Sequence, residues 1–168
     1  RARLHERAGE WLAERAGAAP EELARHWALA GDAPRAAAAY TEAAERAVRV
    51  SADAAATLAL AERALALVQD PAVRFRALAV RDSTLSAAGD RQKQLEGLIA
   101  MEMLADDIGD EQRTEAAWRR CYFARVTSDH EGALAAGRKA LELARRAQSA
   151  RWASTIHNDL AVLMADEG

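Results

Sequence analysis

The side chains that could do chemistry are few in this sequence: four histidines, one cysteine and scattered carboxylates. The histidines fall on four different expected helices, as His5, His26, His130 and His157. His5 and His26 could share the first helical hairpin, yet no further Cys or His stands at metal-ligand spacing beside them. We therefore expect structural or surface roles for the histidines, with no metal and no cofactor.

The carboxylates do not form an acid–base pair by their spacing. His157 and Asp159 invite that interpretation, but residues two apart on a helix do not face one another. Asp106 and Asp107 end an expected helix, where negative charge is electrostatically unfavourable, and one of them could reach a neighbouring helix cap. We expect no catalytic residues and no enzymatic activity.

Cys121 lies in the middle of an expected helix, next to two arginines that could lower its pKa if they approach it. The usual burial of a free cysteine favours a small core residue instead. A lone cysteine forms no internal disulfide, and the sequence has neither a signal peptide nor an apolar run of about 18 residues. We expect a cytoplasmic location and no membrane association.

Composition points to a folded chain made of small apolar side chains. Of the 168 residues, 51% are hydrophobic, 29% are charged and only 5% are aromatic. Abundant alanine favours closely packed helices over sheets. The net charge of −3 is spread along the chain without a basic stripe, which argues against direct binding of nucleic acid.

Short polar joints recur about every 40 residues, and this period is typical of helical solenoids. No repeat of a solenoid buries its apolar face alone, so stacked neighbours form the core. One set of joints reads Gly31-Asp32, Gln69-Asp70, Gly109-Asp110 and Gln148-Ser149. An interleaved set reads Ser51-Ala52-Asp53, Gly89-Asp90, Ser128-Asp129 and Gly168.

Between these joints the pattern predicts nine helices: 2–16, 20–30, 34–50, 53–68, 71–88, 91–108, 110–127, 130–147 and 150–166. Each has a local start or stop signal, because proline suits a first turn, aspartate caps an N-terminus and glycine ends a helix in the left-handed conformation. The expected prolines, caps and glycines are Pro20, Pro34 and Pro71; Asp32, Asp53, Asp70, Asp90, Asp110 and Asp129; Gly31, Gly89 and Gly109.

Joints of two or three residues require consecutive helices to be antiparallel. Pairing them in order leaves the ninth helix without a partner, so we expect Leu160 and Leu163 to be partly exposed and to favour self-association. The chain also begins at Arg1 and ends at Gly168, where a further helix is expected. We expect residues 1–168 to be a single helical-repeat domain, as a fragment of a larger multidomain protein.

Two stretches carry a recognisable repeat pattern. The first has Leu, small and aromatic residues on one helix and Ala, aromatic and Ala on the next, whereas the second keeps the small positions but has Gly137 where an aromatic is usual. This pattern resembles a tetratricopeptide repeat, which implies a right-handed α-solenoid of helical hairpins. The stretches read Leu23-Ala24-x2-Trp27…Ala36-x3-Tyr40-x2-Ala43 and Gly132-Ala133-Leu134…Lys139-Ala140-Leu141.

The opening of the chain has a more specific combination, which includes Glu10-Trp11-Leu12, His26-Trp27 and Gly31-Asp32. It is similar to the start of the helical-repeat arm that follows the nucleotide-binding module in bacterial signal-transduction ATPases, including the large LuxR-type transcription regulators. The resemblance implies an ATPase and an output domain elsewhere in the parent chain. No phosphate loop of the GxxxxGK[ST] type occurs in these residues.

In tetratricopeptide arrays the first helix of each hairpin lines the concave surface. The resemblance therefore implies a candidate groove of aromatic, cationic and small polar side chains, which suits recognition of a peptide or small ligand. Its residues are Arg76, Ser83, Trp118, Tyr122, Arg125, Thr155 and Asn158. The alternative is that Trp118 and Tyr122 belong to the core between repeats.

The function that these observations favour is binding without chemistry. A protein partner, a peptide or a small inducer would fill the groove and bias an attached switch in a cytoplasmic bacterial regulator of transcription. The alternatives are a stand-alone scaffold that assembles other proteins, and a small all-α enzyme that uses His157 or Cys121.

Overall fold

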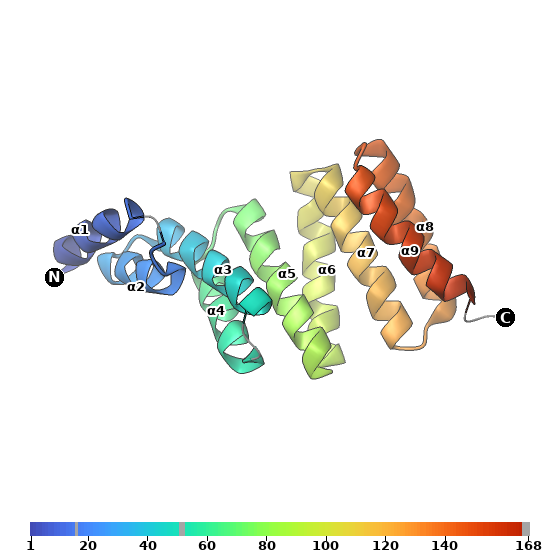
Figure 1. Cartoon of the computed structure of the whole chain (residues 1–168), viewed down its shortest axis with the longest axis horizontal. Coiled ribbons are helices and arrows are strands. Elements are labelled where there is room, and N and C mark those ends of the chain that lie inside the picture. The colour runs from blue at the N-terminus through green and yellow to red at the C-terminus, as the bar shows by residue number, and fades with distance from the viewer. Residues whose placement is uncertain (16, 51–52, 166–168) are drawn as a thin grey trace. The chain divides into compact units, whose positions relative to one another are not determined.

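The chain consists of α-helices and short connections in the part that the computed structural model describes, residues 1–15, 17–50 and 53–165 (Figure 1). Helices make up 87% of these residues. The nine described helices are α1 (Ala2–Ala13), α2 (Pro20–Ala30), α3 (Ala33–Val50), α4 (Ala54–Leu67), α5 (Pro71–Ala88), α6 (Arg91–Ile108), α7 (Asp110–Val126), α8 (His130–Arg146) and α9 (Ala150–Ala165). The predicted all-α class and the nine helices are confirmed.

The predicted helix boundaries agree with the structure to within three residues, and the largest difference is at the end of α1. The predicted joint at Ser51-Ala52, the predicted helix ends at 16 and 166 and the final joint at Gly168 lie outside the described residues. The agreement follows from local chemistry. For example, Asp70 precedes Pro71, and its Oδ1 accepts a hydrogen bond of 2.8 Å from the Val73 amide, which caps α5.

One predicted cap is wrong. Asp110 is the first residue of α7, and the N-cap is Gly109, whose φ of 154° and ψ of 179° also differ from the predicted left-handed helix end. The Asp110 carboxylate instead accepts a hydrogen bond from Arg113 at 2.7 Å. A carboxylate in the first turn still suits the positive end of the helix dipole.

Four joints share one left-handed turn, although only two of them have glycine there. Gly31 and Gly89 have φ of 85° and 77°, and Ser128 and Gln148 have φ of 61° and 52°. In each joint the next amide donates to a carbonyl five residues back, as Asp129 does to Ala124 at 2.9 Å. Ser128-Asp129 therefore adopts the same backbone conformation as the Gly31-Asp32 and Gly89-Asp90 joints, at a conformational cost that glycine avoids.

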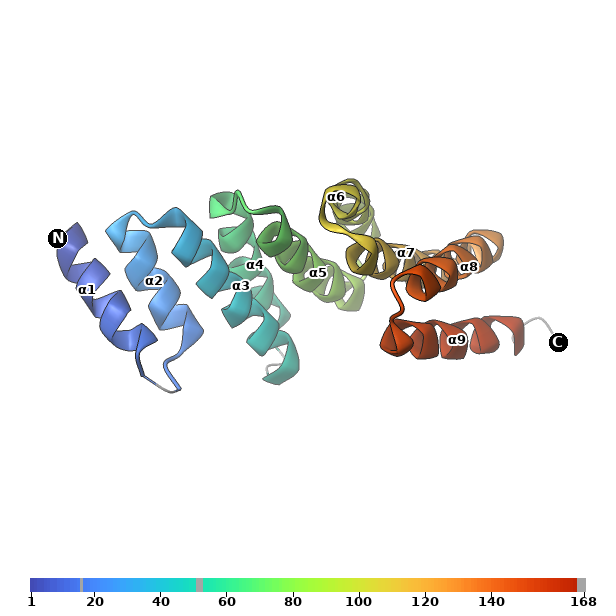
Figure 2. The ribbon, with the colours of Figure 1, turned by 90° about the horizontal axis from the view of Figure 1, so that it is seen from above.

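The chain divides into two compact units, Arg1–Gln94 and Leu95–Gly168, with the boundary inside α6. In the first unit, α1 to α5 pack in chain order as antiparallel neighbours, and α3 also contacts α5 (Figure 2). Its core joins Trp27, Tyr40 and Leu60 to a set of alanines. The repeat-like positions of the first stretch, which include Ala24 and Ala43, are buried in this core.

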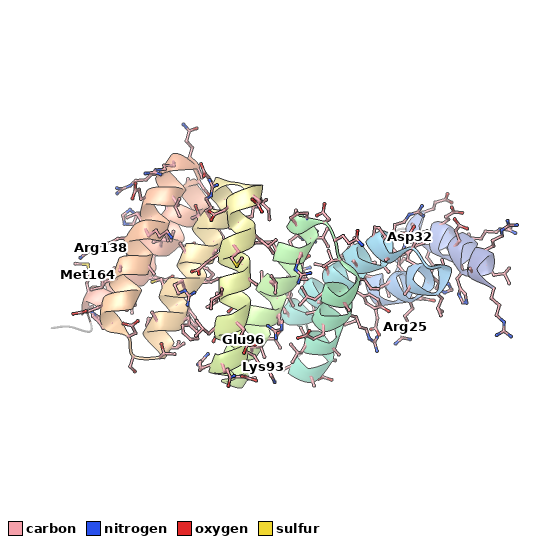
Figure 3. All side chains as sticks on the ribbon, turned by 180° about the vertical axis from the view of Figure 1, so that it is seen from behind. Arg25, Asp32, Lys93, Glu96, Arg138 and Met164 are labelled. Carbon is pink, nitrogen blue, oxygen red and sulfur yellow. The ribbon has the colours of Figure 1, made fainter. Side chains whose placement is uncertain are left out.

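In the second unit, α7, α8 and α9 pack against one another. Trp152, Ile156 and Leu163 of α9 are buried there, with Leu163 only 2% exposed. The expectation that Leu163 is partly exposed is wrong, because α9 lies on two helices and this residue packs beside Cys121. The exposed apolar side chains of α9 are those on its outer side, such as Met164, which lies at the edge of this unit (Figure 3).

The prediction of one continuous right-handed solenoid over residues 1–168 stays a prediction. The first unit contains the expected hairpins α1–α2 and α3–α4, and the second unit contains the expected hairpin α7–α8. Among the described residues, no helix combines the length and apolar character that a membrane crossing requires.

Candidate functional site

The predicted groove residues are divided between the two units. Arg76 and Ser83 are on α5 in the first unit, and the other five are on α7 and α9 in the second. Arg76 makes a bidentate ion pair with Glu45 of α3, at 2.8 and 2.7 Å, and this hydrogen bonding raises the pKa of its guanidinium group. The Ser83 hydroxyl donates to the Ala79 carbonyl at 3.0 Å. We therefore build the candidate site from the second unit.

Trp118 is held in place by two contacts with α9. Its indole N–H donates a hydrogen bond of 2.6 Å to the Asp159 carboxylate. Its ring lies 5.3 Å from the ring of Trp152, centre to centre, at a tilt of 49°. This spacing is normal for stabilising aromatic pairs. Trp118 is half-buried and packs against the cluster that contains Trp152 and Ile156 of α9.

Tyr122 lies one helical turn further along α7 and is 36% exposed. The guanidinium carbon of Arg125 lies 4.9 Å from the centre of the Tyr122 ring, within the range of a cation–π contact. Such a contact between an exposed ring and a cation is worth about 0.5–1 kcal/mol. The pair forms a stacked aromatic and cationic surface whose polar edges remain accessible.

The two polar residues predicted on α9 differ in their contacts. The Thr155 hydroxyl donates to the Arg151 carbonyl at 3.1 Å, so its donor is used within the helix. Asn158 is exposed, and its amide makes no hydrogen bond to any described residue. Asn158 is adjacent in sequence to Asp159, the partner of Trp118. Consecutive residues on a helix point in different directions, so this adjacency does not place Asn158 beside Trp118. We call the set Trp118, Tyr122, Arg125 and Asp159 the α7–α9 face.

Cys121 is a core residue, as the favoured interpretation of the sequence predicted. It is 3% exposed and packs with Ala124, Ala133 and Leu163. Burial raises the pKa of the thiol, the negative charge of Asp159 raises it further, and Arg125 partly opposes both effects. A buried thiol with a raised pKa is a poor nucleophile.

The histidines are distributed as follows. His157 is exposed on α9, and the carboxylate two residues later bonds Trp118 instead. His130 begins α8. His5 and His26 meet between α1 and α2, with their Nδ1 atoms 3.3 Å apart. In residues 1–15, 17–50 and 53–165, no three or more His, Cys, Asp and Glu side chains cluster in a way that could hold a metal ion.

A hollow of about 540 Å³ that was not predicted from the sequence lies in the second unit, between α6, α7 and α8. The hollow is lined by Ala116 and Ala117, and by four cationic side chains, Arg113 and Arg120 of α7 and Lys139 and Arg146 of α8. Each of these two cation pairs is spaced by seven residues, which places both members on one side of a helix. This seven-residue spacing is the feature of the sequence from which the cationic lining of the hollow could have been predicted.

Carboxylates neutralise most of this charge. Glu102 of α6 binds Arg120 through two hydrogen bonds, at 2.9 and 2.8 Å. Arg113 binds Asp106 at 3.1 Å, so the Asp106 carboxylate reaches an arginine of the next helix and caps no amide. The pKa of the Arg113 guanidinium group is raised by its hydrogen bonds to Asp110 and then Asp106, and that of Arg120 by its hydrogen bonds to Glu102. The arginines that line the hollow are therefore paired with carboxylates, and Lys139 is an exposed cation at its rim.

The comparisons with known proteins are negative. The chain matches no protein-family model, and no curated protein matches it significantly.

Proposed function

We propose that this chain is a non-catalytic interaction arm, and that its α7–α9 face binds a short segment of a protein partner. In the parent chain, the arm would serve a cytoplasmic bacterial regulator of transcription and pass the binding event to neighbouring ATPase and output domains. The observation that carries the proposal is the Tyr122 ring, which is exposed and stacked on Arg125. Exposed aromatic and arginine side chains are the types that most often anchor protein interfaces.

The neighbouring contacts support a preorganised surface. The hydrogen bond from Trp118 to Asp159 fixes one aromatic edge beside Tyr122 before any partner arrives. A fixed side chain loses little conformational entropy on binding.

The tetratricopeptide-like pattern of the sequence supports the same proposal, since that family binds peptides along the first helices of its hairpins. α7 and α9 are first helices in the predicted pairing. A stand-alone assembly scaffold would use the same face, and the full-length sequence distinguishes the two. The enzyme alternative loses its nucleophile, because Cys121 is buried and the pKa of its thiol is raised.

A peptide display library selected on the whole chain tests the proposal. We expect selected peptides to bind the α7–α9 face, so that Tyr122→Ala and Arg125→Ala each weaken binding by about 1–2 kcal/mol. The matched control is Lys139→Ala, an exposed cation at the rim of the hollow on other helices. Peptides that bind both α7 variants as well as the wild type, but lose binding to Lys139→Ala, would move the recognition surface to the hollow and refute this proposal.

A further inference from the structure

The first hairpin brings two histidines together by a close approach of its helices. Gly9 is the only buried residue of α1, and a Cβ atom there would lie 3.1 Å from three atoms of the Trp27 ring. The missing side chain lets α1 rest directly on α2. Helices α1 and α2 lie side by side (Figure 2). His5 is one turn before Gly9, and His26 is next to Trp27, so the same helix contact brings the two imidazole rings together.

The geometry of the two rings is informative. Their Nδ1 atoms are 3.3 Å apart, and their centres are 5.3 Å apart. This separation is longer than the usual hydrogen bond from an N–H group, about 2.9–3.0 Å. Two nitrogens that each lie about 2.05 Å from a tetrahedral zinc ion are separated by about 3.3 Å. The nitrogens are therefore spaced as two ligands of one metal ion.

We propose that His5 and His26 form a two-histidine site for a divalent transition-metal ion. Imidazole suits zinc, nickel and copper, whereas magnesium and calcium prefer oxygen ligands. Both nitrogens that face the site would act as lone-pair donors, so both rings carry their proton on Nε2 when the metal is bound. No third protein ligand joins them in the described geometry, so water completes the coordination.

The consequence of binding would be local to α1. This helix contacts α2 and buries only Gly9, while its larger apolar side chains Leu4 and Trp11 are 69% and 53% exposed. With so little buried surface, α1 should open readily from the hairpin. A metal ion that bridges His5 and His26 binds only the closed hairpin and therefore stabilises it. The site is a metal-dependent clamp on the first helix.

The test uses the untagged whole chain, freed of metal by a chelating resin, and titration calorimetry with zinc chloride and with nickel chloride. We expect one ion per chain, with an affinity that falls about 10-fold or more in His5→Gln and in His26→Gln. The matched control is His157→Gln, which removes an exposed histidine of α9 and should leave the affinity unchanged.

Hydrogen exchange gives a second readout. Zinc should slow exchange of the α1 amides in the wild type and in His157→Gln, and should have no effect on α1 in His5→Gln. If His26→Gln loses helicity in its circular dichroism spectrum, His5→Gln carries the test, because α1 has only one buried residue. Binding that is absent, or equally strong in the wild type and in His5→Gln, would overturn the proposal, as would unchanged α1 exchange at saturating zinc.

Discussion

Replacing Trp118 and Tyr122 separately by alanine should have very different effects on stability, although the two residues are one turn apart on the same helix. Trp118→Ala removes an aromatic pair with Trp152, worth about 0.5–1.5 kcal/mol, and a hydrogen bond to the charged Asp159, worth about 1.5–3 kcal/mol. Because Trp118 is half-buried, we take the lower part of the summed range, about 2–3 kcal/mol. Tyr122→Ala removes a partly exposed ring and its contact with Arg125, and should cost about 0.5–1 kcal/mol.

Thermal unfolding of the whole chain, followed by circular dichroism, measures both changes. For a chain of this size about 1 kcal/mol corresponds to about 2–4 °C, so Trp118→Ala should lower Tm by about 4–12 °C and Tyr122→Ala by about 1–4 °C. A double-mutant cycle with Trp118→Ala and Asp159→Ala measures the coupling between the two side chains, since each variant removes one partner of the hydrogen bond. Equal melting temperatures for Trp118→Ala and Tyr122→Ala would refute the claim that α9 holds Trp118.

Three further predictions concern single positions. Asp70→Ala removes the cap of α5 and should cost about 1 kcal/mol in urea unfolding, whereas Asp107→Ala, which caps no helix, should be close to neutral. Ser128→Gly should raise stability by about 1 kcal/mol because it relieves a left-handed backbone, and Gly31→Ala should lower stability at the equivalent turn. The buried Cys121 thiol should react with a thiol reagent only as fast as the chain opens, and fast labelling of the native chain at neutral pH would contradict this. Because the pKa of this thiol is higher in the folded state, the contribution of Cys121 to stability should fall as pH rises past the usual thiol range.

The helices could be predicted because each one is bounded by local signals. Asp70 and Pro71 begin α5 through contacts within one turn, and Gly89 ends it through a backbone conformation that glycine adopts easily. Even the two left-handed joints without glycine, at Ser128 and Gln148, were predicted correctly from their position in the repeat. Gly109 was misassigned, since a glycine next to an aspartate suits either the end of one helix or the cap of the next.

The candidate site depends on contacts between distant residues, and these could not be derived from spacing. The Trp118–Asp159 hydrogen bond joins residues 41 apart, so Asp159 was considered only with His157, its neighbour in sequence. The burial of Leu163 depends on how α9 rests on α7 and α8. A helical period shows which residues share a face, but the partner of that face is a property of the packing.

The hollow between α6, α7 and α8 shows the same limit. The seven-residue spacing of Arg113 and Arg120 is visible in the sequence, but the carboxylates that neutralise them come from α6. Without those carboxylates, the arginines on one side of α7 would predict a binding site for an anion. With them, its net charge is small, which is why we place the recognition surface on the α7–α9 face.

Photo-crosslinking tests that central claim most directly. A photo-reactive phenylalanine analogue would replace Tyr122 in one version of the whole chain and Lys139 in another, each with a peptide selected from the display library. We predict that the peptide crosslinks efficiently from position 122 and at background level from position 139. Crosslinking from position 139 with none from position 122 would contradict the account.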